Sequence, residues 1–280
     1  MITYLFPGQG SQHKGMGENL FSEFPDITQQ ADAILGYSIS TLCLADPEQK
    51  LNQTQFTQPA LYTVNALSYL KKIKDTKRRP DFVLGHSLGE YNALFAAGVF
   101  DFATGLRLVQ KRGELMSQEK NGAMAAVIGM KINELENFLD NDNNVSIANH
   151  NSYLQTVISG LKNNLDTSIL ALQKLNSVTV IPLKVSGAFH SPCMQPAQEK
   201  FTEFLNQFTF SVPALPVLAN INAEIYHPAT IKKNLSAQLA GTVRWTSSIE
   251  ALLAYKNMEF EELGPGKVLS GLVQKIKNNT

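Results

Sequence analysis

Short hydrophobic runs alternate with longer segments of helical periodicity in the first 120 residues. The run Ile2–Phe6 has the length of a buried strand and ends at the glycine-containing segment PGQGSQ. In Thr57–Ile73, leucine and valine recur at steps of three, which predicts a helix with Pro59 in its first turn. A second strand is predicted at Asp81–Gly85, followed by one helix directly after it and another over Asp101–Met116. Strands that alternate with helices predict a parallel sheet with crossover helices.

The middle of the chain has a different order of elements. It contains three strand-like runs, at Gly122–Met130, Gln155–Gly160 and Val178–Ser186. Two helical segments separate these runs. This β-α-β-α-β order predicts a small ferredoxin-like α+β subdomain over residues 121–185. It is inserted in a larger α/β subdomain formed by residues 1–120 and 186–280. In the returning chain we expect two helices and one strand: Pro196–Phe208, Ala229–Leu239 and the segment PVLANI between them.

Length, composition and charge are those of a globular protein without a preference for polyanions. The chain has 280 residues, of which 44% are hydrophobic and 17% charged. Lys plus Arg and Asp plus Glu are equal at 24 each, so we expect neither nucleic acid nor a membrane as a partner. Two cysteines make a disulfide framework improbable. The N-terminus lacks the pattern of a secretory signal, and no run reaches the roughly 20 apolar residues of a membrane span. We therefore expect a cytoplasmic protein.

The segment GHSLG lies between the second predicted strand and its helix. Gly-x-Ser-x-Gly in this context is the pattern of a nucleophile elbow. Gly85 and Gly89 would let the strand and the helix approach closely, and strained backbone angles would expose the hydroxyl of Ser87. Amides at the start of the helix could then stabilise an oxyanion. An ordinary glycine turn has the same spacing, but the strand before and the helix after it favour a catalytic Ser87.

A serine nucleophile needs a base, and the chain has five histidines: His13, His86, His150, His190 and His227. His86 is adjacent to Ser87 in sequence, and its side chain should diverge from the serine at a sharp turn. Three of the others stand in polar segments and are expected at the surface. His190 directly follows a predicted strand, where open α/β sheets gather catalytic groups. From the pattern alone, a structural histidine at position 190 is as good an interpretation as a catalytic one.

Seven segments together resemble the malonyl-CoA:acyl-carrier-protein transacylase family: FPGQGSQHKGMG, TQPAL, GHSLGEYNAL, LVQKRGELM, GAMAAVIG, GAFHSPCM and LGPGKVLSGL. The resemblance runs in order from Phe6 to about Leu272. Within the family, the first of these segments and the longer runs TQFTQPALYTVNALSYLK and GHSLGEYNALFAAGVFDFATGL look most like the stand-alone, trans-acting acyltransferases of modular polyketide synthases, of the disorazole synthase type. The fatty-acid-synthesis transacylase is a close sibling. The fold that this resemblance implies is an α/β-hydrolase-like large subdomain with a ferredoxin-like small one.

The resemblance assigns the reacting groups. It makes Ser87 the nucleophile and His190 its general base. The second imidazole nitrogen of the base would donate to the backbone carbonyl of Gln238, which takes the place of the carboxylate of a triad. The backbone amides of Gln9 and Leu88 would form the oxyanion hole. From the residues alone, Gln9 would be a plain loop residue.

The resemblance also implies a binding site for the acyl group. Arg112 would clamp the free carboxylate of malonyl, although the sequence alone favours a solvated helix charge at this position. Phe189, in GAFH, is typical of malonyl users and would narrow the pocket near the α-carbon. Asn151 and His86 are further candidates for lining the cleft. The sequence departs from the family at Tyr153, because a proline usually follows the serine that stands here at position 152. The path of the loop at this point is therefore left open.

The implied reaction is ping-pong transfer of malonyl from malonyl-CoA to the phosphopantetheine thiol of an acyl carrier protein, through a malonyl-serine, in trans for polyketide synthase modules. No metal and no bound cofactor are expected, and the family is usually monomeric. The alternatives are a fatty-acid-synthesis transacylase, a non-catalytic docking module and a proofreading acyl hydrolase of carrier-protein thioesters. The hydrolase would have no use for Arg112. Lys14, Lys184 and Arg244 are candidates for a basic rim that meets an acidic carrier protein; each could equally be an ordinary surface charge.

Overall fold

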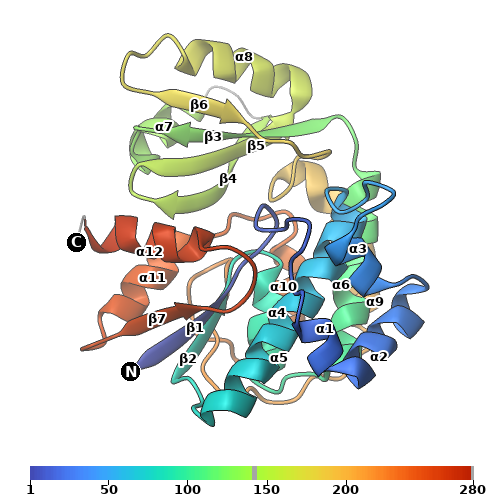
Figure 1. Cartoon of the computed structure of the whole chain (residues 1–280). Helices are drawn as coiled ribbons and strands as arrows, with labels where there is room; N and C mark the ends of the chain where they lie inside the picture. Colours follow the sequence, from blue (N-terminus) through green and yellow to red (C-terminus); the bar gives the residue numbers. More distant parts are fainter. Residues whose placement is uncertain (141–143, 279–280) are drawn as a thin grey trace.

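The computed structural model describes residues 1–140 and 144–278. Its strands are β1 (Ile2–Phe6), β2 (Phe82–Gly85), β3 (Gly122–Ile128), β4 (Val145–Ser152), β5 (Gln155–Leu161), β6 (Thr179–Pro182) and β7 (Glu259–Glu262). Its helices are α1 (Leu20–Glu23), α2 (Pro25–Leu35), α3 (Ile39–Leu44), α4 (Thr54–Thr76), α5 (Gly89–Ala96), α6 (Phe102–Gln118), α7 (Ile132–Leu139), α8 (Lys162–Leu172), α9 (Gln195–Leu205), α10 (Ile231–Ala237), α11 (Trp245–Leu253) and α12 (Val268–Lys277), with 3₁₀ turns η1 (Pro192–Met194) and η2 (Pro228–Thr230). Two separate sheets divide the chain into a larger and a smaller part, one above the other in Figure 1.

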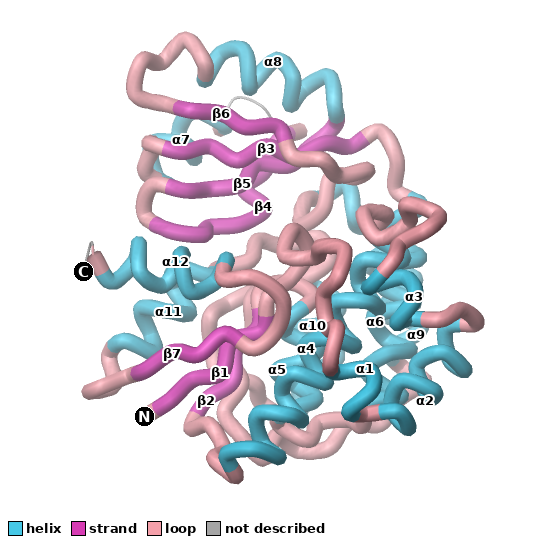
Figure 2. Tube along the Cα trace, viewed as in Figure 1, coloured by secondary structure: helices cyan, strands magenta, loops and turns pink. Residues whose placement is uncertain are grey.

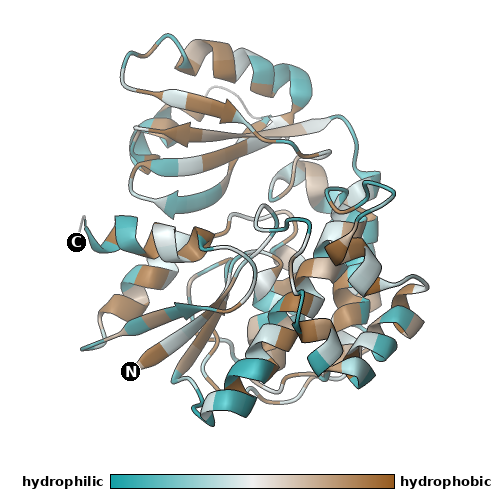
Figure 3. Ribbon diagram, in the orientation of Figure 1, coloured by the Kyte–Doolittle hydropathy of each residue, from teal (hydrophilic) through white to brown (hydrophobic). Residues whose placement is uncertain are grey.

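A parallel sheet in the order β2-β1-β7 lies inside the larger part. Successive side chains of a strand point to opposite faces. Tyr4 and Phe6 therefore join the core under α4 and α5, whereas Leu5 joins the core formed with α11 and α12. Helices cover both faces of this sheet, so every residue of β1 and β2 is buried, and Figure 3 shows β2 mostly in the hydrophobic colour. The α/β fold class predicted from the sequence is confirmed.

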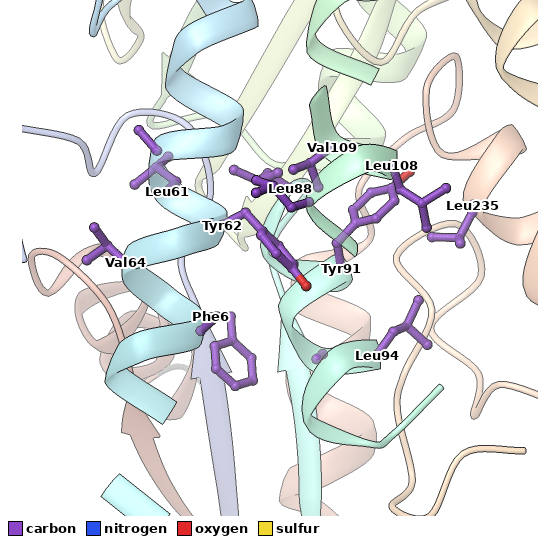
Figure 4. Packing of buried hydrophobic residues seen from close by; sticks show 14 of the residues in the cluster. Phe6, Leu61, Tyr62, Val64, Leu88, Tyr91, Leu94, Leu108, Val109 and Leu235 are labelled. Carbon is purple, nitrogen blue, oxygen red and sulfur yellow. The ribbon is translucent and has the colours of Figure 1, made fainter. Parts of the chain in front are cut away.

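The larger hydrophobic core fixes the start of α5. Tyr62 of α4, Tyr91 and Leu94 of α5 and Val109 of α6 converge there, all of them almost inaccessible to solvent (Figure 4). Burying a large hydrophobic side chain contributes about 1.5–3 kcal/mol. The turn that precedes α5 is thus held against α4 and α6, the two helices that carry other polar groups of the site.

Helix α4 begins earlier than the periodicity predicts. Its first residue is Thr54, and Pro59 lies inside the helix and not in the first turn. The missing N–H of Pro59 removes the helical bond to the carbonyl of Gln55. In this added first turn, Gln58 Nε2 donates to Thr54 Oγ1 at 3.0 Å. Such contacts are not visible in the hydrophobic pattern.

The segment PVLANI does not form the strand predicted for it. Val217 makes a single parallel bridge to Val83 of β2, and the N–H of Val83 donates to the carbonyl of Pro216 at 3.0 Å. Pro216 has no N–H with which to continue the ladder. The sheet is therefore extended at this edge by this one bridge and not by a further strand.

The smaller part has the element order β3-α7-β4-β5-α8-β6, and its sheet has the order β4-β5-β3-β6 with antiparallel neighbours (Figure 2). This is the ferredoxin-like arrangement. The sequence analysis missed β4, because the strand is rich in Asn, His and Ser. Its polar side chains Asn149 and Asn151 are nevertheless buried, and Asn149 bridges to Val243 of the larger part. Pairing with β5 and contact with the larger part thus place polar residues in β4. Among the described residues no helix has the length and apolar content for crossing a membrane.

Candidate active site

The turn between β2 and α5 holds Ser87 in a left-handed conformation, with a φ of 50°. The two flanking glycines make this turn possible. A Cβ on Gly85 would lie 1.8 Å from the carbonyl carbon of Gly89, and a Cβ on Gly89 would lie 2.0 Å from the carbonyl oxygen of Phe6. No side chain fits at either position, which is the geometry of a nucleophile elbow.

Hydrogen bonds from distant segments hold this strained serine. Its N–H donates to Asn220 Oδ1 at 2.7 Å, and Asn220 Nδ2 donates to the carbonyl of Gly85 at 2.7 Å. The carbonyl of Ser87 accepts from Gln238 Nε2 at 2.8 Å. A non-glycine residue in this region costs about 1–3 kcal/mol, and these bonds offset that cost. The backbone on both sides of the hydroxyl is therefore fixed.

His190 lies beside this hydroxyl, although 103 residues separate the two in sequence. Ser87 Oγ and His190 Nε2 are 2.7 Å apart, and His190 Nδ1 is 2.7 Å from the carbonyl oxygen of Gln238. A carbonyl only accepts, so Nδ1 carries the proton and Nε2 is left to accept the proton of Ser87. Burial first, and then the charge of Arg112, lower the pKa of His190 to about 3. The imidazole is therefore neutral at physiological pH.

Arg112 is buried in this site and is not the solvated helix charge that the sequence alone favours. It is 1% exposed. Its Nη1 donates to Gln58 Oε1 at 2.6 Å, and its Nη2 donates to Gln238 Oε1 at 2.8 Å and to Ser87 Oγ at 3.2 Å. These acceptors are neutral, and Nε has no partner among the described residues. A buried cation with neutral partners favours an anionic ligand, because such a ligand would compensate the charge.

The amides predicted for the oxyanion hole are available. In the part of the chain that the structure describes, the backbone N–H groups of Gln9 and Leu88 have no hydrogen-bond partner. Leu88 directly precedes the first turn of α5. The side chain of Gln9 is anchored by Thr54, whose Oγ1 donates to Gln9 Oε1 at 2.9 Å. Both residues line the same cavity as Ser87.

Two neighbouring cavities form the cleft of the site. The inner one, of about 90 Å³, is lined by Ser87, His190, Arg112 and Phe189. The outer one, of about 210 Å³, lies between the loop 7–11, β4 and α12, and it shares Gln9 and His86 with the inner one. A ligand with a small reacting end and a longer tail fits this shape.

The remaining predicted residues lie at the edge of the cleft or behind it. His86 Nε2 is 2.8 Å from Asn151 Oδ1 in the outer cavity, so this contact joins the two parts of the chain. Gln238 lies behind His190 and Arg112 and contacts both of them. Tyr153, in the turn after β4, donates its hydroxyl to Glu250 of α11 at 2.6 Å.

Several other predictions have mixed outcomes. His13 and His227 are exposed as expected, but His150 lies in β4 and is half-buried. Three basic residues proposed for the rim are exposed: Lys14, Lys184 and Arg244. Among the described residues, no group of three or more His, Cys, Asp or Glu is placed to hold a metal ion.

Sequence reasoning missed three residues of this site. Gln58 and Glu90 lie within TQPAL and GHSLGEYNAL, two of the segments that carry the family resemblance. Their position in these segments could have indicated a role in the site. Asn220, 133 residues after Ser87, carries no local signal. Its role follows only from the bridging of its segment to β2.

Known proteins similar to this chain include malonyl CoA-acyl carrier protein transacylases. The family model of the acyl transferase domain matches residues 3–275. The chain is 55% identical to the polyketide biosynthesis malonyl CoA-acyl carrier protein transacylase PksC of Bacillus subtilis (strain 168), over 100% of this chain and 98% of the relative.

Two solved structures superpose closely on this one. The crystal structure of a malonyl CoA-acyl carrier protein transacylase from Burkholderia pseudomallei has a TM-score of 0.97 and 48% identity, and covers 100% of this chain and 99% of its own. A type II polyketide synthase acyl-carrier protein in complex with its malonyl-transacylase gives a TM-score of 0.94 and 35% identity, over 99% of this chain and 93% of that chain. The matched span and these identities show that the chain belongs to the acyl transferase domain family, among its malonyl-CoA:acyl-carrier-protein transacylases.

Proposed function

We propose that this protein transfers malonyl from malonyl-CoA to the phosphopantetheine thiol of an acyl carrier protein, in trans for a polyketide synthase. One observation carries the proposal. Ser87 Oγ lies 2.7 Å from a neutral imidazole nitrogen of His190 and 3.2 Å from a buried guanidinium nitrogen of Arg112. A nucleophile, its base and a cation that can bind a carboxylate therefore meet at one point.

The first half-reaction loads the serine. His190 Nε2 takes the proton of the Ser87 hydroxyl while Oγ attacks the thioester carbon of malonyl-CoA. The amides of Gln9 and Leu88 bind the oxygen that becomes negative in the tetrahedral intermediate. The intermediate collapses to a malonyl-serine ester, and the CoA thiolate leaves with the proton from His190.

The second half-reaction reverses these roles with a different thiol. The phosphopantetheine S–H gives its proton to His190, and the sulfur attacks the ester carbon. Ser87 Oγ leaves and takes the proton back, which restores the free enzyme. The substrates carry the activated acyl group as a thioester, so we expect that neither a metal nor a bound cofactor is needed.

Arg112 supports malonyl as the acyl group. Its guanidinium is fixed by the amide oxygens of Gln58 and Gln238, in the cavity that also holds Ser87. The free carboxylate of malonyl can pair with it, whereas acetyl offers the guanidinium no carboxylate to bind. Phe189, buried and in the wall of the same cavity, limits the space beside the α-carbon.

The cleft supports a carrier protein as the acceptor. The outer cavity gives an extended arm access to the serine from between the two parts of the chain, which we propose comprise residues 1–120 with 186–280 and residues 121–185. A polyketide pathway is favoured by the relative of 55% identity, whose name places it in polyketide biosynthesis. We expect the enzyme to act as a cytoplasmic monomer. A proofreading hydrolase is the second candidate, but a buried Arg112 has no role in releasing acyl chains that lack a free carboxylate.

Carrier-protein loading tests the proposal against this alternative. The purified enzyme is mixed with phosphopantetheinylated carrier protein and labelled malonyl-, methylmalonyl- or acetyl-CoA. We expect malonyl to accumulate on the carrier protein well ahead of the other two acyl groups. A hydrolase would instead release the acyl group from acetyl-loaded carrier protein to water, and this result would overturn the proposal.

A further inference from the structure

Glu90 is an acidic side chain that the mechanism above does not use. It lies three residues after Ser87, in the first turn of α5, and it is inaccessible to solvent. Burying a carboxyl group is costly unless several donors compensate it. Its retention directly below the elbow therefore calls for an explanation in terms of its contacts.

Three donors converge on the Glu90 carboxyl group. The backbone N–H of Asn220 donates to Oε1 at 3.1 Å, and the hydroxyl of Tyr226 donates to the same oxygen. Gln238 Nε2 donates to Oε2. A carboxylate accepts all three bonds, whereas a protonated carboxyl group would bring a hydrogen toward one of these donors. The surroundings are thus built for the ionised form.

The third donor connects Glu90 to the reacting groups. Gln238 accepts from His190 through its backbone carbonyl and from Arg112 through Oε1, and its Nε2 also donates to the carbonyl of Ser87. One residue therefore touches the nucleophile, the base and the acyl clamp, and Glu90 holds the amide of that residue. Asn220, which Glu90 also holds, fixes the N–H of Ser87.

We propose that ionised Glu90 is a positioning residue of the acyl-transfer site, which holds Gln238 and Asn220 and through them orients His190, Arg112 and the elbow. It also supplies a buried negative charge one side chain away from Arg112, which compensates the cation while no substrate carboxylate is bound. The inference rests on the proposed function, because it concerns the same reaction.

The charge state of Glu90 has a consequence for the pH profile. The titratable groups around it are Arg112 from α6, Tyr91 from α5, Tyr226 from the segment before η2, and His190 through Gln238. Burial raises the pKa of Glu90 to about 7, against the lowering effect of its donors and of Arg112. Below this pH the carboxyl group is protonated, and its hydrogen competes with the three donors, so Glu90 holds Gln238 and Asn220 less firmly. Acylation of Ser87 should therefore fall as the pH drops through about 7.

Three variants test this assignment in single-turnover acylation of Ser87 by malonyl-CoA, measured by mass spectrometry between pH 6 and 8.5. Glu90→Gln removes the charge, and we expect its acylation rate at pH 8.5 to be about ten- to a hundredfold below that of wild type. We also expect that its rate does not fall as the pH drops through about 7, so that the acidic limb of the pH–rate profile is absent. Glu90→Asp keeps the charge and should restore the limb together with part of the rate. Glu114→Gln, an exposed glutamate on α6, is the control and should match wild type.

Tyr226→Phe provides a test that does not remove the carboxyl group. It deletes one donor to the carboxylate, so the pKa of Glu90 rises and the acidic limb should move up by roughly half to one pH unit. A limb at the same pH in wild type, Glu90→Gln and Tyr226→Phe would overturn the inference. Wild type that is never acylated would overturn the proposed function instead, so the two failures are distinguishable.

Discussion

Replacing Arg112 by glutamine should change acyl preference more than any other single substitution in the site. In the free protein each Nη of Arg112 is bonded to a neutral amide oxygen, and the side chain is 1% exposed. Malonyl binding would give the guanidinium a negatively charged acceptor that the amide oxygens do not supply, a gain of about 1.5–3 kcal/mol. Solvent screening reduces this gain only slightly at a buried position. Arg112→Gln should therefore lose roughly ten- to a hundredfold in malonyl transfer relative to acetyl transfer.

The assay compares acylation of Ser87 by malonyl-CoA and by acetyl-CoA in separate single-turnover reactions. The quantity of interest is the ratio of the two rate constants, because a general loss of activity cancels in it. Arg107→Gln is the matched control, since Arg107 lies on the same helix, α6, but is exposed. If circular dichroism shows an intact fold and the ratio is the same in Arg112→Gln and wild type, the carboxylate clamp is wrongly assigned.

Two further substitutions test the elbow and the base. Gly89→Ala would place a Cβ 2.0 Å from the carbonyl oxygen of Phe6, so urea denaturation should show a loss of about 3 kcal/mol or more; unaltered stability would contradict the close approach of β1 and α5. For His190, the folded pKa of about 3 lies below the unfolded value of about 6.5, so only the unfolded chain gains a proton between these values and stability falls as the pH decreases. The stability of wild type relative to His190→Gln should accordingly decrease by about 2 kcal/mol from pH 7 to pH 5, and a constant difference in urea denaturation would refute the buried neutral imidazole.

The elbow and the alternation of strands and helices were predictable because they depend on local pattern. Gly85 allows the close approach of β2 and α5, and Gly89 that of β1 and α5; the position of the serine between them follows from the residues alone. His190 was predictable only in part. Its place after a strand-like segment indicated a catalytic edge, but its partner at Gln238 required the resemblance.

The polar interior of the site could not be predicted from periodicity. Arg112 stands on a helix whose sequence gives no sign that this one charge faces inward, and it is buried because Gln58 and Gln238 approach from two other segments. Strand β4 was missed for a related reason. Its Asn149 and Asn151 side chains line the cleft, so the strand lacks the hydrophobic alternation that identifies strands elsewhere.

The most direct test of the account is a covalent adduct on Ser87. Wild-type protein is mixed with malonyl-CoA without carrier protein, digested and analysed by peptide mass spectrometry, and the Ser87→Ala variant is treated in the same way. The account predicts a malonyl ester on the wild-type peptide that contains Ser87, which disappears when phosphopantetheinylated carrier protein is added, and no adduct in the variant. Malonyl transfer to the carrier protein by the Ser87→Ala variant at the wild-type rate would contradict it.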